Sequence, residues 1–245
     1  MAIVRKFTIG VAPFQKMFRI HGRGGEAVDA VLRLRNKGLD EDYFTEVGSN
    51  SERTVYKVTS EDQHNLLQLS EDSIQLAKDY YGSTTSFDFK KVLDEFRLIW
   101  GALNGVLQVQ DVRRIGMVAE YRYRVEDRSA SAWLRAHLTK FPARHETAKF
   151  HMRLEERELA SDGKLPDPKK ADFINFIYTF YDSSSDAVHP TPGHVDVDLD
   201  VQRYFTPLLS GSVADELLKL KKHFDPAVAR LDEHLKSLGL AHGKK

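Results

Sequence analysis

The sequence of 245 residues contains no cysteine, which excludes disulfide bonds, thiolate catalysis and cysteine-ligated zinc or iron–sulfur centres. It has no apolar run near the roughly 18 residues that a membrane-spanning helix needs. Arg5 and Lys6 interrupt the first segment, where a signal peptide would be apolar. Net charge is also absent, because 36 basic residues balance 36 acidic ones. We therefore expect a cytoplasmic protein that does not contact a membrane, and binding to nucleic acid would require a local basic patch.

The sequence also lacks the common catalytic signatures. It has no Walker A loop, no G-x-S-x-G nucleophile elbow and no H-E-x-x-H helix. Isolated histidines such as His137 and His234 stand beside apolar residues in predicted helices, which is typical of packed or surface histidines. The sequence thus leans away from an enzyme and predicts no catalytic residue, no bound metal and no cofactor. A site assembled from dispersed residues stays open as an alternative.

What the sequence does contain is the pattern of a folded α+β protein. Its apolar content of 41% and charged content of 29% are typical of a chain with a real core. Alternating and three-to-four-residue apolar periodicities predict the elements of the first half. These are a strand at 3–14, a helix at 26–38, short strands at 42–48, 53–60, 65–70 and about 73–77, and a long helix at 88–104.

The same order of elements begins again in the second half. The patterns predict strands at 112–125, 147–160, 172–182 and 194–205, with a short helix around Trp133 after the first of them. Residues 172–182 are apolar at nearly every position, which indicates a central strand. A long helical region follows Val213, with Ser212 as its N-cap and Pro226 as the point where it divides or bends.

In each half, the pattern therefore predicts a strand, a helix, several antiparallel strands and a long helix, in that order. We expect two such units, 1–108 and 109–245, within one continuous domain. This arrangement resembles TATA-binding-protein-like and helix-grip folds, in which long helices cover one face of a curved sheet. A likeness of fold implies no function by itself.

Three quoted stretches between residues 70 and 125 carry a second resemblance. They are "DYYG", the helix segment "FRLIWGAL" and the strand "RRIGMVAEYRY". Together they resemble a sporadically distributed family of uncharacterised bacterial proteins. The resemblance implies an α+β architecture, a bacterial source, and no established activity or catalytic residues.

The stretch "HGRGGEA" fits the loose G-x-G-x-x-A pattern of a dinucleotide-binding turn, with Gly22, Gly24 and Ala27 at the patterned positions. A dinucleotide fold needs alternating parallel strands and helices after this turn, whereas this chain continues with antiparallel strands. We interpret the stretch as a flexible turn between a strand and a helix. A phosphate contact through Arg23 remains the alternative.

The stretch "HVDVDLD" places His194, Asp196, Asp198 and Asp200 on one face of a strand and apolar residues on the other. Same-face neighbours lie roughly 6.5–7 Å apart, so one hard cation reaches them only if they converge. We therefore interpret the aspartates as a stripe and not as a metal site. If neighbouring strands share the sheet, we expect the aspartates to form cross-strand charge pairs with the arginines and lysines of those strands.

The predicted partner-binding surface is this mixed-charge face, on the side of the sheet away from the helices. Its residues are Arg114, Arg122, Arg124, Lys149, Arg153, Arg157, Asp196, Asp198 and Asp200. The loop at 183–193 and the C-terminal helix are further expected contact surfaces.

Three functions are compatible with these patterns. The leading hypothesis is a non-catalytic binding or assembly protein whose partner is another protein. The second is a nucleic-acid-binding protein that uses the arginine and lysine stripes. The third is a small-ligand pocket between the helices and the sheet. We also consider a homo-oligomer formed through the apolar seam from Leu217 to Leu238. The alternative is that this helix docks on the chain's own sheet, which would use the same residues.

Overall fold

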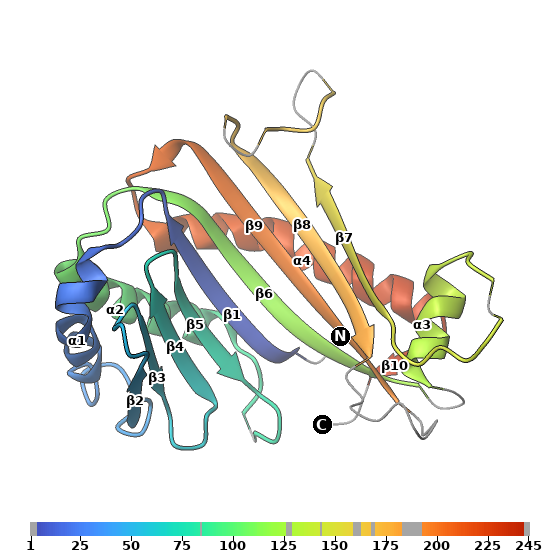
Figure 1. Cartoon of the computed structure of the whole chain (residues 1–245), viewed down its shortest axis with the longest axis horizontal. Helices are drawn as coiled ribbons and strands as arrows, with labels where there is room; N and C mark the ends of the chain where they lie inside the picture. Colours follow the sequence, from blue (N-terminus) through green and yellow to red (C-terminus); the bar gives the residue numbers. More distant parts are fainter. Residues whose placement is uncertain are drawn as a thin grey trace.

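The computed structural model describes residues 4–83, 85–125, 129–142, 144–158, 163–167, 170–182 and 193–242. Within them the chain forms one sheet of ten strands together with four helices (Figure 1). The first half contributes β1 (Val4–Pro13), α1 (Arg19–Leu32), β2 (Glu46–Ser49), β3 (Val55–Thr59), β4 (Asn65–Ser70), β5 (Ile74–Asp79) and α2 (Phe89–Leu107). The second contributes β6 (Val112–Arg124), α3 (Ala130–Leu138), β7 (His151–Arg157), β8 (Phe173–Asp182), β9 (His194–Leu209), α4 (Val213–Ser237) and β10 (Ala241–His242).

The first strands of the two halves meet in the middle of the sheet. The strand order is β2-β3-β4-β5-β1-β6-β9-β8-β7, with antiparallel neighbours throughout. β1 pairs with β6 so that Gly10 lies opposite Gly116, and β10 pairs with the far end of β6. The predicted α+β fold, with two units of strand, helix, antiparallel strands and long helix, is confirmed.

Side chains alternate between the two faces of the sheet, and the helices pack on one of them. On β1, Phe7 and Ile9 are fully buried, whereas Lys6 and Thr8 are partly exposed. Helix α4 packs on β6 and β9, and α1 packs on α2 and β3. Figure 1 shows α2 and α4 behind the sheet. We call the opposite side, which carries Lys6, Thr8 and the aspartates of β9, the helix-free face.

Aromatic packing joins the two units into one core. The ring of Phe7 on β1 contacts Phe89 of α2 at a centroid distance of 6.1 Å and Phe224 of α4 at 5.9 Å, both edge to face. This geometry is the favoured one for aromatic pairs. Because one side chain contacts the long helix of each unit, the core is continuous across the centre of the sheet.

The glycine-rich stretch lies inside α1, so the predicted turn before a helix at residue 26 is wrong. The helix begins at Arg19. Gly24 faces β3, where an added Cβ would lie 2.2 Å from Cε2 of Tyr56. Arg23 donates to Glu26 and, at 2.8 Å, to the carbonyl of Val106. The stretch therefore brings α1 close to the sheet, and Arg23 is engaged in packing contacts between helices.

Of the two alternatives predicted at Pro226, the division into two helices is wrong, because α4 is one helix that contains this residue. Its predicted N-cap is correct, because the Ser212 hydroxyl accepts a hydrogen bond from the amide of Asp215 at 3.2 Å. The apolar seam packs into the chain's own core, with Leu217, Leu220 and Leu235 fully buried. That packing uses the side chains that self-association through this helix would need.

The outermost strand of the second unit is β7, which is shorter than the predicted strand at 147–160. Leu154 of this strand is 46% exposed, since β7 is paired on one side only within the described residues. β8 lies between β7 and β9, as a doubly apolar strand should. Residues 183–192 of the predicted contact loop lie outside the described residues. Among those described, no helix is long and apolar enough to cross a membrane.

Candidate functional site

The helix-free face collects most of the residues that the sequence predicts for partner binding. The register of β6 and β9 places Arg122 opposite Asp196, Glu120 opposite Asp198 and Gly116 opposite Gln202. The other predicted members lie on the same face of β6, β7 and β9 or, for Lys149, just before β7. They are Arg114, Arg124, Asp200, Arg153, Arg157 and Lys149.

Asp196 is the one aspartate of the stripe that pairs with arginine as predicted. Although only 4% exposed, it accepts two parallel hydrogen bonds from Arg122, from Nε to Oδ1 and from Nη2 to Oδ2, both at 2.7 Å. Arg5 of β1 adds a longer contact of 3.6 Å to Oδ2. Bidentate pairing of this kind fixes both side chains. The pair therefore locks β6 to β9 at the edge of the face.

An exposed tyrosine that the sequence analysis did not select covers these arginines. Tyr81 follows β5 and is 59% exposed. The guanidinium carbon of Arg5 lies 4.5 Å from the centroid of its ring, and that of Arg122 lies 5.9 Å away. Such contacts between cations and aromatic rings are attractive. The "DYYG" stretch carries Tyr81, but only the fold shows that it lies over β1 and β6.

Asp198 does not pair with an arginine, so this part of the prediction is wrong. Its Oδ1 accepts a hydrogen bond from the Tyr181 hydroxyl at 3.2 Å, and it has no ion pair with a described residue. Burial raises the pKa of Asp198 to about 6, and the charges of Glu120 and Asp196 add to this. The Tyr181 hydrogen bond and Lys6 act in the opposite direction. The ammonium nitrogen of Lys6 forms its ion pair with Glu120 instead, at 3.4 Å from Oε1.

Asp200 is also without an ion pair among the described residues. Its Oδ2 accepts a hydrogen bond of 2.5 Å from the Gln202 side chain. Burial raises the pKa of Asp200 to about 6. The Gln202 hydrogen bond and the charges of Arg114 and Arg153 lower it, and Glu155 raises it. Two successive aspartates on this face are thus half-buried carboxylates whose only hydrogen-bond donors are neutral.

The flanking arginines are already engaged by other groups. Arg157 and Arg153 of β7 both contact Glu155, at 2.8 and 3.5 Å. Arg114 donates to the Tyr204 hydroxyl at 3.2 Å and to Gln202 at 3.4 Å. The face is therefore a set of local pairs with two uncompensated carboxylates among them.

Removing either uncompensated charge should stabilise the protein at neutral pH. Because burial raises both pKa values from the ordinary 3.8, the stabilising contribution of each protonated carboxyl is full below about pH 4 and is lost as the pH rises through about 6. We expect Asp198→Asn and Asp200→Asn each to raise the free energy of unfolding by about 1–2 kcal/mol near pH 7.5. Near pH 4 the gain should vanish.

Thermal or urea unfolding at both pH values measures this difference. Asp72→Asn is the matched control, since Asp72 lies in an exposed turn and its side chain is 73% accessible. It should change stability by less than about 0.5 kcal/mol at either pH. A lower stability of the two asparagine variants near pH 7.5 would contradict the expectation.

The aspartates are not arranged as a metal site. Within the described part of the chain, no group of three or more histidine, aspartate or glutamate side chains is placed to hold a metal ion.

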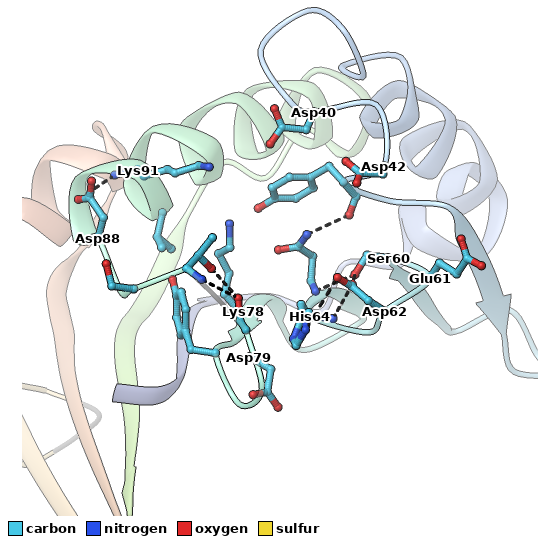
Figure 2. Close-up of a pocket in the computed structure, with 17 residues that line it drawn as sticks. Asp40, Asp42, Ser60, Glu61, Asp62, His64, Lys78, Asp79, Asp88 and Lys91 are labelled. Carbon is cyan, nitrogen blue, oxygen red and sulfur yellow. Dashed lines mark hydrogen bonds and ion pairs between the residues drawn. The ribbon is translucent and has the colours of Figure 1, made fainter. Parts of the chain in front are cut away.

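A separate pocket of about 670 Å³ lies between the β3–β4 turn, the end of β5 and the first turns of α2 (Figure 2). Its rim carries carboxylates from several segments, and Lys78 and Lys91 project between them. Lys78 is only 13% accessible and binds Glu95 of α2 at 2.7 Å. The Tyr43 hydroxyl donates to the same carboxylate at 2.9 Å.

This pocket escaped the sequence analysis because its residues come from separate segments and form no motif. The rim residues are Asp40, Asp42, Glu61, Asp62, Asp79 and Asp88. Asp62 is already bound by the Ser60 hydroxyl and the His64 amide, and Asp88 caps α2. The pocket is thus an acidic hollow above a buried structural ion pair. The aromatic side chains of Tyr121 and Trp133, between the helices and the sheet, are buried in the core.

Neither a protein-family model nor a curated protein sequence matches this chain. Its site must therefore be interpreted from its own geometry.

Proposed function

We propose that this chain is a non-catalytic binding protein that presents the helix-free face of its sheet to another protein. One observation carries the proposal: Asp198 and Asp200 are half-buried carboxylates on an open face, and neither forms an ion pair with a described residue. Such groups lower the stability of the free protein at neutral pH. Shifted ionisable groups of this kind concentrate at functional sites, where a ligand offsets their destabilising effect.

The form of the face also supports a macromolecular partner. Gly10 and Gly116 lie opposite each other at its centre, so the backbone there can be approached closely. The same face also carries Tyr81 and Tyr204, and tyrosine is enriched in protein interfaces. A cytoplasmic location, a bacterial source and the likeness to the sporadic bacterial family belong to the same proposal.

Nucleic acid is the second candidate, because arginines and exposed aromatics together can bind single strands. It has weaker support. The guanidinium of Arg122 is bound to Asp196, and those of Arg153 and Arg157 contact Glu155, so little basic charge is left for phosphates. The zero net charge of the chain points the same way.

Site-specific photocrosslinking in the native cell tests the proposal. A photoreactive amino acid at Thr8, on the helix-free face, should give a discrete crosslinked product that protease digests and nuclease leaves intact. The same amino acid at Lys222, exposed on α4, is the matched control and should give no such product.

Two results would overturn the proposal. A product that is removed by nuclease and not by protease would assign the face to nucleic acid. A product formed equally well from Lys222 and from Thr8 would show that the helix-free face is not the contact surface.

A further inference from the structure

The uncompensated groups on the helix-free face are all hydrogen-bond acceptors. Asp198 uses one oxygen for Tyr181, and Asp200 uses one for Gln202. Each carboxylate therefore retains an oxygen that forms no hydrogen bond or ion pair with a described residue. An ionised carboxylate offers about four lone-pair positions and donates nothing.

A neighbouring amide has the same need, and this observation does not depend on charge. Asn175 of β8 is 2% exposed and lies opposite Gln202, beside Asp200 on the same face. Its Oδ1 is buried and has no hydrogen-bond partner. A buried acceptor without a donor costs about 1–3 kcal/mol, so such atoms are uncommon in native proteins. We call Asp198, Asp200 and Asn175 together the acceptor strip.

The strip is bordered by cations that are occupied elsewhere. On one side Lys6 contacts Glu120, and on the other Arg153 contacts Glu155. At its ends stand Arg122, held by Asp196, and Arg114, held by neutral groups. Each of these four cations is thus held by another group, and none of them forms an ion pair with Asp198 or Asp200.

We infer that the acceptor strip binds a cationic side chain, arginine or lysine, supplied by an extended segment of the partner protein. This inference rests on the proposed function and specifies the chemistry of the partner. A guanidinium offers five donors in one plane and can serve several acceptors at once. A cation placed between two half-buried carboxylates restores the ionised state that burial disfavours.

The spacing of the strip fits an extended partner. Asp198 and Asp200 are two residues apart on β9, which corresponds to roughly 6.5–7 Å. Basic residues at alternate positions of an extended peptide repeat at the same distance. A segment with this pattern can therefore place one cation beside each aspartate.

Binding of a defined peptide tests the inference. The probe is a fluorescent peptide in which arginine alternates with glycine, measured by anisotropy at low ionic strength and neutral pH. The double variant Asp198→Asn, Asp200→Asn should bind it about tenfold or more weakly than the wild type. Because these substitutions are expected to stabilise the fold, weaker binding cannot be attributed to unfolding.

The control variant Asp72→Asn, Glu233→Gln removes the same amount of charge from exposed positions outside the strip. It should weaken binding less than about twofold, since screened surface charges act weakly. A peptide in which glutamate replaces arginine should not bind the wild type. Equal losses in the two double variants would overturn the inference, because they would show attraction by net charge alone.

The crosslinking experiment separates this inference from the function on which it rests. If Thr8 captures a protein and the double asparagine variant captures it equally well, the face is the binding site and the acceptor strip is not its recognition element. If Thr8 captures nothing in either background, the proposed function itself fails.

Discussion

Replacing Glu95 by glutamine is expected to lower the free energy of unfolding by about 3 kcal/mol, because it leaves the ammonium group of Lys78 buried without its counter-charge. Glu95 is 6% exposed and holds both Lys78 and the Tyr43 hydroxyl. For a chain of this size the melting temperature should fall by about 6–12 °C. Thermal unfolding monitored by circular dichroism measures the change.

Two comparisons show whether the buried pair is the cause. Asp94→Asn, one residue away on the same helix, removes an exposed contact with Lys90 and should change stability by less than about 0.5 kcal/mol. Adding Lys78→Met to Glu95→Gln should recover part of the loss, since the unpaired cation is then gone. A Glu95→Gln variant as stable as the wild type would contradict the assignment of this pair.

Alanine at Gly24 should destabilise the protein by about 1–3 kcal/mol, the range found for overfilled sites in cores. The added Cβ would lie 2.2 Å from Cε2 and 2.6 Å from Cζ of the Tyr56 ring, which is itself 7% exposed. Either α1 moves away from β3 or the ring leaves its place. Urea unfolding of the purified variant measures the loss.

The neighbouring glycines provide controls for which alanine should change the stability in the opposite direction. An added Cβ at Gly22 or Gly25 meets no atom within 4 Å, and both residues lie within α1. Alanine at either position should stabilise the protein by about 0.5–1 kcal/mol through helix propensity. If all three alanine variants behaved alike, the close contact between α1 and β3 would not be the reason for Gly24.

The strands were predictable because their patterns are strong. The regular alternation in β6 and β9 identified both their buried and their polar sides, and the wide apolar stripe of α2 marked that helix. The start of α1 was not predictable. Phe18 precedes the helix without a side-chain cap, and three glycines, which are poor helix formers, follow it. Of these, only Gly24 is explained by the structure, through its close approach to Tyr56.

The pairing of charges on the candidate site could be predicted only in part. Two facing stripes were visible in the sequence, but the register between them was not. A shift of two residues would place Arg122 opposite Asp198 in place of Asp196 and would leave the face polar. Burial of the neighbouring apolar residues does not distinguish these registers by pattern alone, so the uncompensated aspartates emerge only from the fold.

The central pairing of β1 with β6 has a consequence for assembly. Two units that join first strand to first strand, with Gly10 opposite Gly116, are arranged as the subunits of a symmetric dimer would be. The chain thereby covers, within one molecule, the strand edge at which a single unit would pair with a second copy. Within the described residues the outermost strands are the short β2 and the charge-rich β7, and strands of this kind resist edge-to-edge growth. Each half of the chain thus covers the β1 or β6 edge of the other, and the strands left at the outside are poor sites for pairing with another molecule.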